Sequence, residues 1–299
     1  MVEIYCLYGQ DHFCSTEDAK EIVYFKQADQ AEELRKHSER EDDYNSKMED
    51  LFRYLNYREN ELGDLYPFKV SKDTIETKYE DCIKSCPIYI FLLLCSNLLF
   101  VTKSDQDVLT KEFEICSFYS MKKLVSDLYQ THIFGTSRVD NIFSGNARER
   151  IEKLANMLNT RTTRTFKEDR RYDVPGGDAG LDIVSFASLD SESFFPLIMV
   201  QCACSYDEWQ KKQNDIHEAK WNHIFESIAP YMKFMFVPFF WREKDNIFLN
   251  RTEIYTCLYD RLRIMKILVN TDTYQEYCVE MERFIRSNHL DVVNSWDSI

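Results

Sequence analysis

Glycine and proline are scarce in this chain, with 7 and 6 residues among 299. Both residues end helices and build turns, so their scarcity predicts that helices occupy much of the chain. The 10 cysteines include no recurring CxxC pair, which argues against a zinc ribbon. We therefore expect the cysteines to be buried thiols of a protein in a reducing compartment.

Basic residues are outnumbered: 37 Lys and Arg stand against 51 Asp and Glu, a formal net charge of −14. A freestanding nucleic-acid-binding domain is usually basic. The acidic balance therefore argues against tight, unaided binding to bulk DNA and favours a protein partner. It does not exclude a nuclease, because acidic residues also build metal sites.

The one long apolar segment is 87–101, PIYIFLLLCSNLLFV. It is shorter than the roughly 20 residues that a helix needs to cross a bilayer, and it contains Ser96 and Asn97. It predicts a buried core helix with Pro87 in its first turn, and no membrane association. The chain does not open with a basic segment followed by an apolar one, so we expect no signal peptide and a cytoplasmic location.

Hydrophobic residues make up 44% of the chain and aromatic residues 14%, which supplies a sizeable core. Up to about residue 140 the pattern is mainly helical, with amphipathic helices predicted within 17–60 and over 106–128. The opening segment, 1–16, has the composition of a short strand. We therefore predict a helical N-terminal region, residues 1–140, followed by a mixed α/β region, residues 141–299.

The second region alternates predicted helices and strands. A helix with apolar residues at helical spacing follows Asn146. After it we expect a first strand within 160–174, a tight turn over 175–178, strands over 180–186 and 196–203, a helix over 206–229, a strand over 231–240, and closing helices over 252–270 and 273–288. Asp178 in the tight turn either supports a site or serves the turn alone.

Two polar side chains interrupt the central strands. Asp182 lies inside GLDIVSF, and Gln201 lies inside PLIMVQCA, each among apolar neighbours. Burying a carboxylate is costly unless it is paired or bound to a metal ion. We therefore expect Asp182 and Gln201 to contribute to one shared site.

The segments GLDIV and IMVQCA resemble the metal-binding hairpin of the PD-(D/E)XK, or restriction-endonuclease-like, nucleases. In that family an Asp lies in one strand, and an acidic residue or Gln lies in the next strand, two residues before a Lys. Asp182 and Gln201 match the first two positions, whereas Ala203 stands at the third. The family also uses a lysine displaced to the following helix, which makes Lys212, or Lys211, the candidate here.

The resemblance implies a restriction-endonuclease-like αβββαβ core whose first helix directs a glutamate at the metal site. IEKL, in the helix after Asn146, makes Glu152 the expected residue. Glu149 and Glu114 are the alternatives.

A metal site follows from the same resemblance. Glu152, Asp182, Gln201 and the main-chain carbonyl of Cys202 would bind Mg²⁺, or Mn²⁺, through oxygen atoms, which these ions prefer. Lys212 would orient the attacking water or stabilise the charge that develops during hydrolysis.

A basic segment precedes the central strands. Residues 160–174, TRTTRTFKEDRRYDV, carry the basic residues Arg161, Arg164, Lys167, Arg170 and Arg171. Arg and Lys neutralise phosphates, so these side chains are candidates for contacts with a nucleic-acid backbone. The alternative is a solvated loop.

The resemblance implies an Mg²⁺-dependent nuclease acting on nucleic acid, DNA more than RNA, as the effector of an antiphage or restriction-type system. We expect it to work with a protein partner or as a homo-oligomer. The alternative is a catalytically inactive nuclease fold that serves as an interaction module, which Ala203 and the acidic charge favour.

Overall fold

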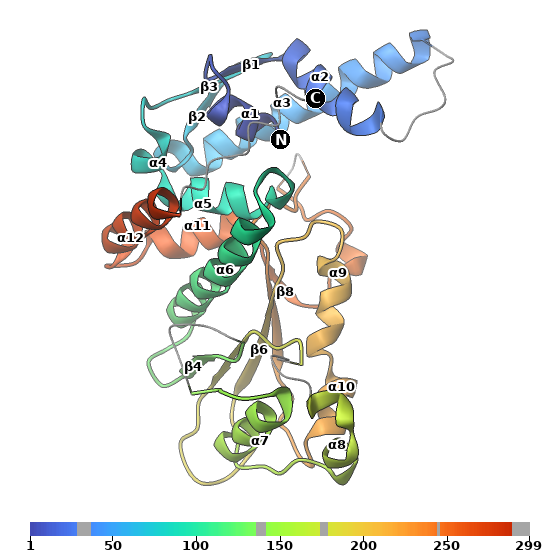
Figure 1. The fold of residues 1–299 in the computed structure, drawn as a ribbon, viewed down its shortest axis with the longest axis vertical. Helices are drawn as coiled ribbons and strands as arrows, with labels where there is room; N and C mark the ends of the chain where they lie inside the picture. Colours follow the sequence, from blue (N-terminus) through green and yellow to red (C-terminus); the bar gives the residue numbers. More distant parts are fainter. Residues whose placement is uncertain (29–36, 136–141, 174–178, 244–245, 289–299) are drawn as a thin grey trace. The chain divides into compact units, whose positions relative to one another are not determined.

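The computed structural model describes residues 1–28, 37–135, 142–173, 179–243 and 246–288 (Figure 1). The chain divides into two compact units, neither of which is continuous in sequence. The first unit comprises Met1–Asp105, Trp241–Leu249 and Asp272–Ile299, and the second comprises Gln106–Phe240 and Asn250–Thr271. The second unit thus begins before the boundary that we expected near residue 140.

The first unit combines helices with a three-stranded antiparallel sheet in the order β1-β3-β2. Its strands are β1 (Phe13–Ser15), β2 (Phe68–Val70) and β3 (Thr74–Thr77). Its helices are α1 (Val2–Tyr8), α2 (Thr16–Ala28), α3 (His37–Leu62), α4 (Cys82–Ser85), α5 (Pro87–Cys95) and α12 (Tyr274–Ser287), with short 3₁₀ helices η1 (Gly63–Leu65) and η2 (Leu98–Phe100). The opening segment therefore forms a helix and then a strand, and the mainly helical region also contains a small sheet.

Only the first part of the apolar segment 87–101 forms the predicted buried helix: α5 ends at Cys95 and is buried at every position. The rest of the segment contains η2, in which Leu99 is exposed. Pro87 occupies the first turn of α5, as predicted, where the missing N–H removes no helical hydrogen bond. Phe91 packs edge-on against Phe284 of α12, with the ring centroids 5.8 Å apart. Among the described residues, no helix is both long and apolar enough to span a membrane.

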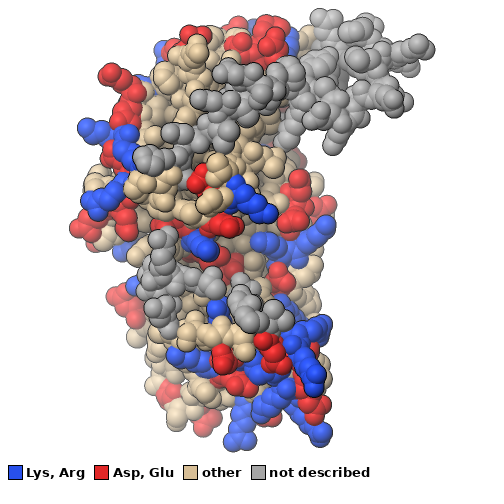
Figure 2. Space-filling model, viewed as in Figure 1, with Lys and Arg blue, Asp and Glu red and all other residues tan. Residues whose placement is uncertain are grey.

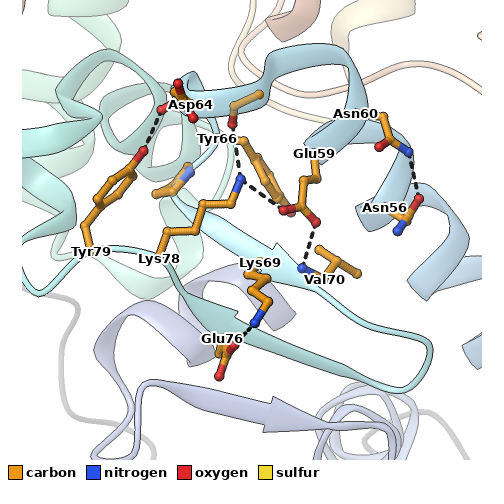
Figure 3. Close-up of polar contacts among 12 residues, drawn as sticks. Asn56, Glu59, Asn60, Asp64, Tyr66, Lys69, Val70, Glu76, Lys78 and Tyr79 are labelled. Carbon is orange, nitrogen blue, oxygen red and sulfur yellow. Dashed lines mark hydrogen bonds and ion pairs between the residues drawn. The ribbon is translucent and has the colours of Figure 1, made fainter.

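Polar side chains connect the end of α3 to the three-stranded sheet of the first unit (Figure 3). Glu59 accepts a hydrogen bond from the main-chain nitrogen of Val70 at 2.8 Å and pairs with Lys78 at 3.0 Å. Lys78 also donates to the carbonyl of Gly63 at 3.2 Å. These bonds fix the chain where α3 ends and β2 begins.

The second unit is built on a five-stranded mixed sheet in the order β4-β5-β6-β7-β8. Its strands are β4 (Gln130–Ile133), β5 (Ile183–Phe186), β6 (Leu197–Cys202), β7 (Met232–Phe236) and β8 (Cys257–Tyr259). The pairs β4–β5 and β5–β6 are antiparallel, whereas β6–β7 and β7–β8 are parallel. Ile183 pairs with Val200, so the start of β5 lies beside the end of β6.

The helices of the second unit are α6 (Lys103–Leu124), whose first residues belong to the first unit, α7 (Ala147–Met157), α8 (Arg164–Glu168), α9 (Trp209–Lys212), α10 (Glu218–Ile224) and α11 (Arg261–Val269). Three 3₁₀ helices accompany them: η3 (Arg170–Asp173), η4 (Gln213–Ile216) and η5 (Arg251–Glu253).

The two faces of β6 pack against different helices, as strand alternation predicts. Leu197 lies in an apolar core with Leu154 of α7 and Trp221 of α10. On the other face, the thiol of Cys202 lies within hydrogen-bonding reach of Ser117 of α6. Figure 1 accordingly shows α6 and α10 on opposite sides of the strands. The sheet therefore forms the middle layer of this unit.

Three sequence predictions for this unit are wrong. Residues 160–174 are not the first strand but contain α8 and η3, because Thr163 caps α8 by accepting a hydrogen bond from the nitrogen of Phe166 at 3.1 Å. Segment 252–270 is not one helix, since β8 precedes the buried cap Asp260 of α11. The helix predicted over 206–229 is divided by η4 into α9 and α10.

Candidate functional site

A pocket of about 240 Å³ lies where β5 begins and β6 ends. Its walls come from α6, from the turn before β5, from the end of β6 and from the segment formed by α9 and η4. The charged and amide side chains that line it are Glu114, Asp182, Gln201, Lys212 and Asp215. Three residues selected from the sequence, Asp182, Gln201 and Lys212, therefore meet in one pocket, and Cys202 lines it as well.

Asp182 directly precedes β5 and is buried, with 4% of its surface exposed. Its main-chain nitrogen donates to the carbonyl of Val200 at 3.1 Å, and its carbonyl accepts from the nitrogen of Phe134 at 2.7 Å. Its Oδ2 accepts a hydrogen bond from the main-chain nitrogen of Cys202 at 2.6 Å. Contacts from both neighbouring strands thus fix the carboxylate in the pocket wall.

Gln201 lies in β6 and is buried, with 3% of its surface exposed. Its Nε2 donates to the main-chain carbonyl of Cys202, an expected metal ligand, at 3.3 Å. Its Oε1 is buried and accepts no hydrogen bond from the residues that the structure describes. A buried acceptor without a donor costs about 1–3 kcal/mol. This oxygen therefore marks a place where a ligand would be stabilised.

The turn before Asp182 is held by η4 and α10. Ala179 and Gly180 both have positive φ, 52° and 65°. A Cβ on Gly180 would lie 2.5 Å from Cγ of Asp215, so the close approach requires glycine. Lys220 donates to the carbonyl of Ala179 and pairs with Asp215 at 3.6 Å. Asp215 was not predicted for the site; its spacing of three from Lys212 is the signal that would have suggested it.

The glutamate of the pocket is Glu114, not Glu152. Glu114 is half-buried on α6, and its Oε2 lies 3.3 Å from the position that a Cβ would take at Gly135, just after β4. Glu152 is exposed on α7 and is not part of the pocket lining. Glu149 is engaged in the capping box of α7 with Asn146. The first strand of the five-stranded sheet is β4, and not residues 160–174 as we expected. The helix that precedes this strand is therefore α6, which carries Glu114, and not α7, which carries Glu152.

Lys212 lines the pocket at the end of α9, whereas its neighbour Lys211 is exposed and does not. Trp209, three residues before Lys212 in the same helix, is fully buried. Ala203, which stands where the resemblance expects a lysine, is also buried, and its nitrogen donates to the carbonyl of Phe236 at 3.0 Å.

The environment of the Cys202 thiol disfavours its ionised form, which metal binding requires. Burial raises its pKa well above the usual value, and the nearby carboxylates of Asp182 and Glu114 raise it further, although Ser117 lowers it. A metal-binding cysteine has to be deprotonated. The metal ligands that this side of the pocket offers are therefore oxygen atoms. No disulfide joins the described cysteines, most of which are buried.

The oxygen atoms of the pocket suit a small divalent ion. The described residues contain no group of three or more His, Cys, Asp or Glu placed to hold a metal ion. The pocket instead offers the carboxylates of Glu114 and Asp182 and the amide oxygen of Gln201. Mg²⁺ is commonly bound through one or two carboxylates and keeps several waters, so these residues fit Mg²⁺ or Mn²⁺. They do not fit a structural zinc ion, which takes four nitrogen or sulfur ligands.

The basic segment lies on α8, on η3 and just before them, outside the pocket lining. Its five exposed side chains are Arg161, Arg164, Lys167, Arg170 and Arg171. Two are neutralised nearby: Arg164 pairs with Glu168 at 2.7 Å, and Arg171 pairs with Asp169 at 2.6 Å. The other three form no ion pair within the described part of the chain. Figure 2 shows Lys and Arg gathered in the lower part of the view, with acidic residues among them.

Asp178 and the turn over 175–178 lie outside the described residues. No protein-family model, no curated protein and no solved structure matches this chain. What the protein does is therefore inferred from the residues of the pocket.

Proposed function

We propose that the second unit is a metal-dependent nuclease that hydrolyses phosphodiester bonds of nucleic acid, DNA in preference to RNA, in an antiphage or restriction-type system. The observation that carries the proposal is the convergence of Asp182, Gln201, Lys212 and Glu114 on one pocket. Two carboxylates, an unsatisfied amide oxygen and an ammonium group are the chemical groups that metal-assisted phosphodiester hydrolysis uses.

The order of elements supports a restriction-endonuclease-like core for this unit. Helix α6, strands β4, β5 and β6, helices α9 and α10, and strand β7 follow the order αβββαβ, with β7 parallel to β6. Helices α7 and α8 are inserted between β4 and β5. The pocket lies beside the β5–β6 pair, to which the resemblance assigns metal binding.

The polar groups of the pocket have two main roles in the proposed reaction, metal binding and charge stabilisation. Asp182, Glu114 and Gln201 would hold Mg²⁺ or Mn²⁺, and the bound ion would supply Lewis-acid activation of phosphate and water. The hydrogen bond from the main-chain N–H of Cys202 fixes the orientation of the Asp182 carboxylate. The ammonium group of Lys212 stabilises negative charge on the phosphate as the bond breaks.

A second candidate is an inactive nuclease fold that binds a protein partner. Two observations favour it: Ala203 is buried where the family carries its lysine, and the chain has a net charge of −14. The candidates differ on Lys212, which has a catalytic role only in the nuclease.

Incubation of the purified chain with plasmid, linear DNA and RNA tests the proposal. The nuclease should give products in Mg²⁺ or Mn²⁺, and EDTA should suppress them. The same assay with added proteins encoded by neighbouring genes tests for a required partner, and a mass measurement in solution tests for a homo-oligomer. Absence of cleavage in every combination would reject the nuclease and support the inactive module.

Glu114→Gln is expected to weaken Mn²⁺ binding by about 10- to 100-fold, because it removes one of the two carboxylates proposed to hold the ion. Glu152→Gln, on exposed α7, serves as the matched control and should bind Mn²⁺ like the wild type. Titration followed by electron paramagnetic resonance of free Mn²⁺ measures both. A loss in Glu152→Gln without a loss in Glu114→Gln would reverse the assignment.

Replacing Arg161, Lys167 and Arg170 together by Ala is expected to weaken DNA binding and to lower its salt dependence by about one unit of slope per lost phosphate contact. Arg164→Ala with Arg171→Ala is the control, because acidic neighbours already neutralise these two side chains. Fluorescence anisotropy with labelled DNA over a range of salt concentrations measures the effect. Equal losses in both sets would show a diffuse charge effect instead of a binding surface.

A further inference from the structure

Gln213 joins the segment that carries Lys212 to the chain just before β8. Gln213 is buried, with 1% of its surface exposed. Its Nε2 donates to the carbonyl of Glu253 at 2.9 Å. Its Oε1 accepts hydrogen bonds from the main-chain nitrogen of Tyr255 at 3.1 Å and from the hydroxyl of Thr256 at 2.9 Å. One amide group therefore bonds with both ends to a segment that is 40 or more positions away in sequence.

The helix that carries Lys212 is short and has little stability of its own. Helix α9 has four residues and no side-chain hydrogen bond at its N-cap, Glu208. A helix of this length is not stable by itself. Buried Trp209 holds its start, and Gln213 begins η4 directly after Lys212. The position of the Lys212 backbone therefore depends on the packing of Trp209, on the bonds of Gln213 and on the contacts of Asp215 with Gly180 and α10.

We infer that Gln213 is a positioning residue for Lys212: by tying η4 to residues 253–256, it holds the ammonium group at the pocket. Its consequence for cleavage rests on the proposed nuclease function, whereas its effect on the place of Lys212 does not. A displacement of a catalytic group by about 1 Å can cost on the order of 100-fold in rate. Gln213 thus acts on the reaction through Lys212, without lining the pocket.

The structural part of the inference is tested without substrate. Gln213→Leu removes both sets of hydrogen bonds, Gln213→Glu keeps an acceptor but loses the donor, and Asn214→Ala is an exposed neighbouring control. In Gln213→Leu we expect amide exchange at Tyr255 to rise about tenfold or more. The rate at which Lys212 is acylated, measured by peptide mass spectrometry, should approach the rate for exposed Lys211. If Gln213→Leu does not fold, Gln213→Glu should show smaller changes, in the same direction, in the amide exchange of Tyr255 and the acylation of Lys212.

Unchanged acylation of Lys212 in a folded Gln213 variant, despite faster exchange at Tyr255, would overturn the inference. In Asn214→Ala both rates should equal those of the wild type. A shift of Lys212 acylation in Asn214→Ala as large as in Gln213→Leu would also overturn it, because any change in η4 would then have the same effect.

The catalytic part is tested by combining variants. Gln213→Leu should lower kcat by about 10- to 100-fold with little change in KM, and should cause no further loss in a Lys212→Ala background. An equal fractional loss in both backgrounds would show that Gln213 acts on the fold alone, and would overturn the inference. If the wild type cleaves nothing, the proposed function fails, and the acylation of Lys212 still decides whether Gln213 positions it.

Discussion

Asp182→Asn is expected to reduce metal-dependent cleavage by about 10³-fold or more while leaving the fold intact. Asparagine has the shape of aspartate and keeps an oxygen that can accept the hydrogen bond from Cys202, which is 2.6 Å long in the native chain. It lacks the negative charge that holds a divalent ion. The variant therefore separates the chemical role of the carboxylate from its structural role.

Rates of product formation in Mn²⁺, together with thermal unfolding, measure the outcome. Asp182→Ala is the companion variant, because it also removes the acceptor for the buried Cys202 N–H. Leaving that donor unpaired costs about 1–3 kcal/mol. The alanine variant should therefore unfold at a lower temperature than the asparagine variant, although both should be inactive. Cleavage by Asp182→Asn at the wild-type rate would remove Asp182 from the site.

Lys212→Ala is expected to lower the cleavage rate by about 10²- to 10³-fold while Mn²⁺ binding is retained, because an ammonium group stabilises transition-state charge and does not bind the ion. Lys212 lines the pocket, and exposed Lys211 points elsewhere, since neighbours on a helix point about 100° apart. Lys211→Ala is therefore the matched control, with a rate within about twofold of the wild type.

Single-turnover cleavage at saturating substrate measures the effect, and a Mn²⁺ titration of the same samples measures metal binding. If Lys212→Ala cleaves at the wild-type rate while Asp182→Asn is inactive, the displaced lysine has no catalytic role, and the metal-bound carboxylates act without it. If Lys211→Ala is as slow as Lys212→Ala, the loss reflects the net charge of α9 and not a directed contact.

Local pattern was sufficient for the central strands of the second unit and for part of the site. Asp182 and Gln201 stood out because each lies among residues that strands bury, and the structure buries both beside one pocket. Pro87 and the apolar run after it fixed the start of α5 in the same way. In each case, the residues within a few positions were sufficient for the prediction.

Local sequence pattern was not sufficient to predict which helix contributes the glutamate of the pocket. Glu152 follows from the assumption that residues 160–174 form the first strand, whereas Glu114 follows from the place of β4 at the edge of the sheet. Strand order depends on contacts between distant segments. β8 has three residues, too few for an alternating pattern to identify. The spacing of Asp215 from Lys212 could have suggested that both side chains share one side of the helix, but the contact of Asp215 with Gly180 depends on the fold.

In the proposed function, the pocket at the junction of β5 and β6 binds a divalent ion through oxygen atoms. Anomalous diffraction from crystals soaked in Mn²⁺ tests it most directly. We expect an anomalous peak in this pocket, within coordination distance, about 2.0–2.2 Å, of the Asp182 carboxylate and of Oε1 of Gln201. A pocket without a peak in crystals that bind Mn²⁺ elsewhere would contradict it.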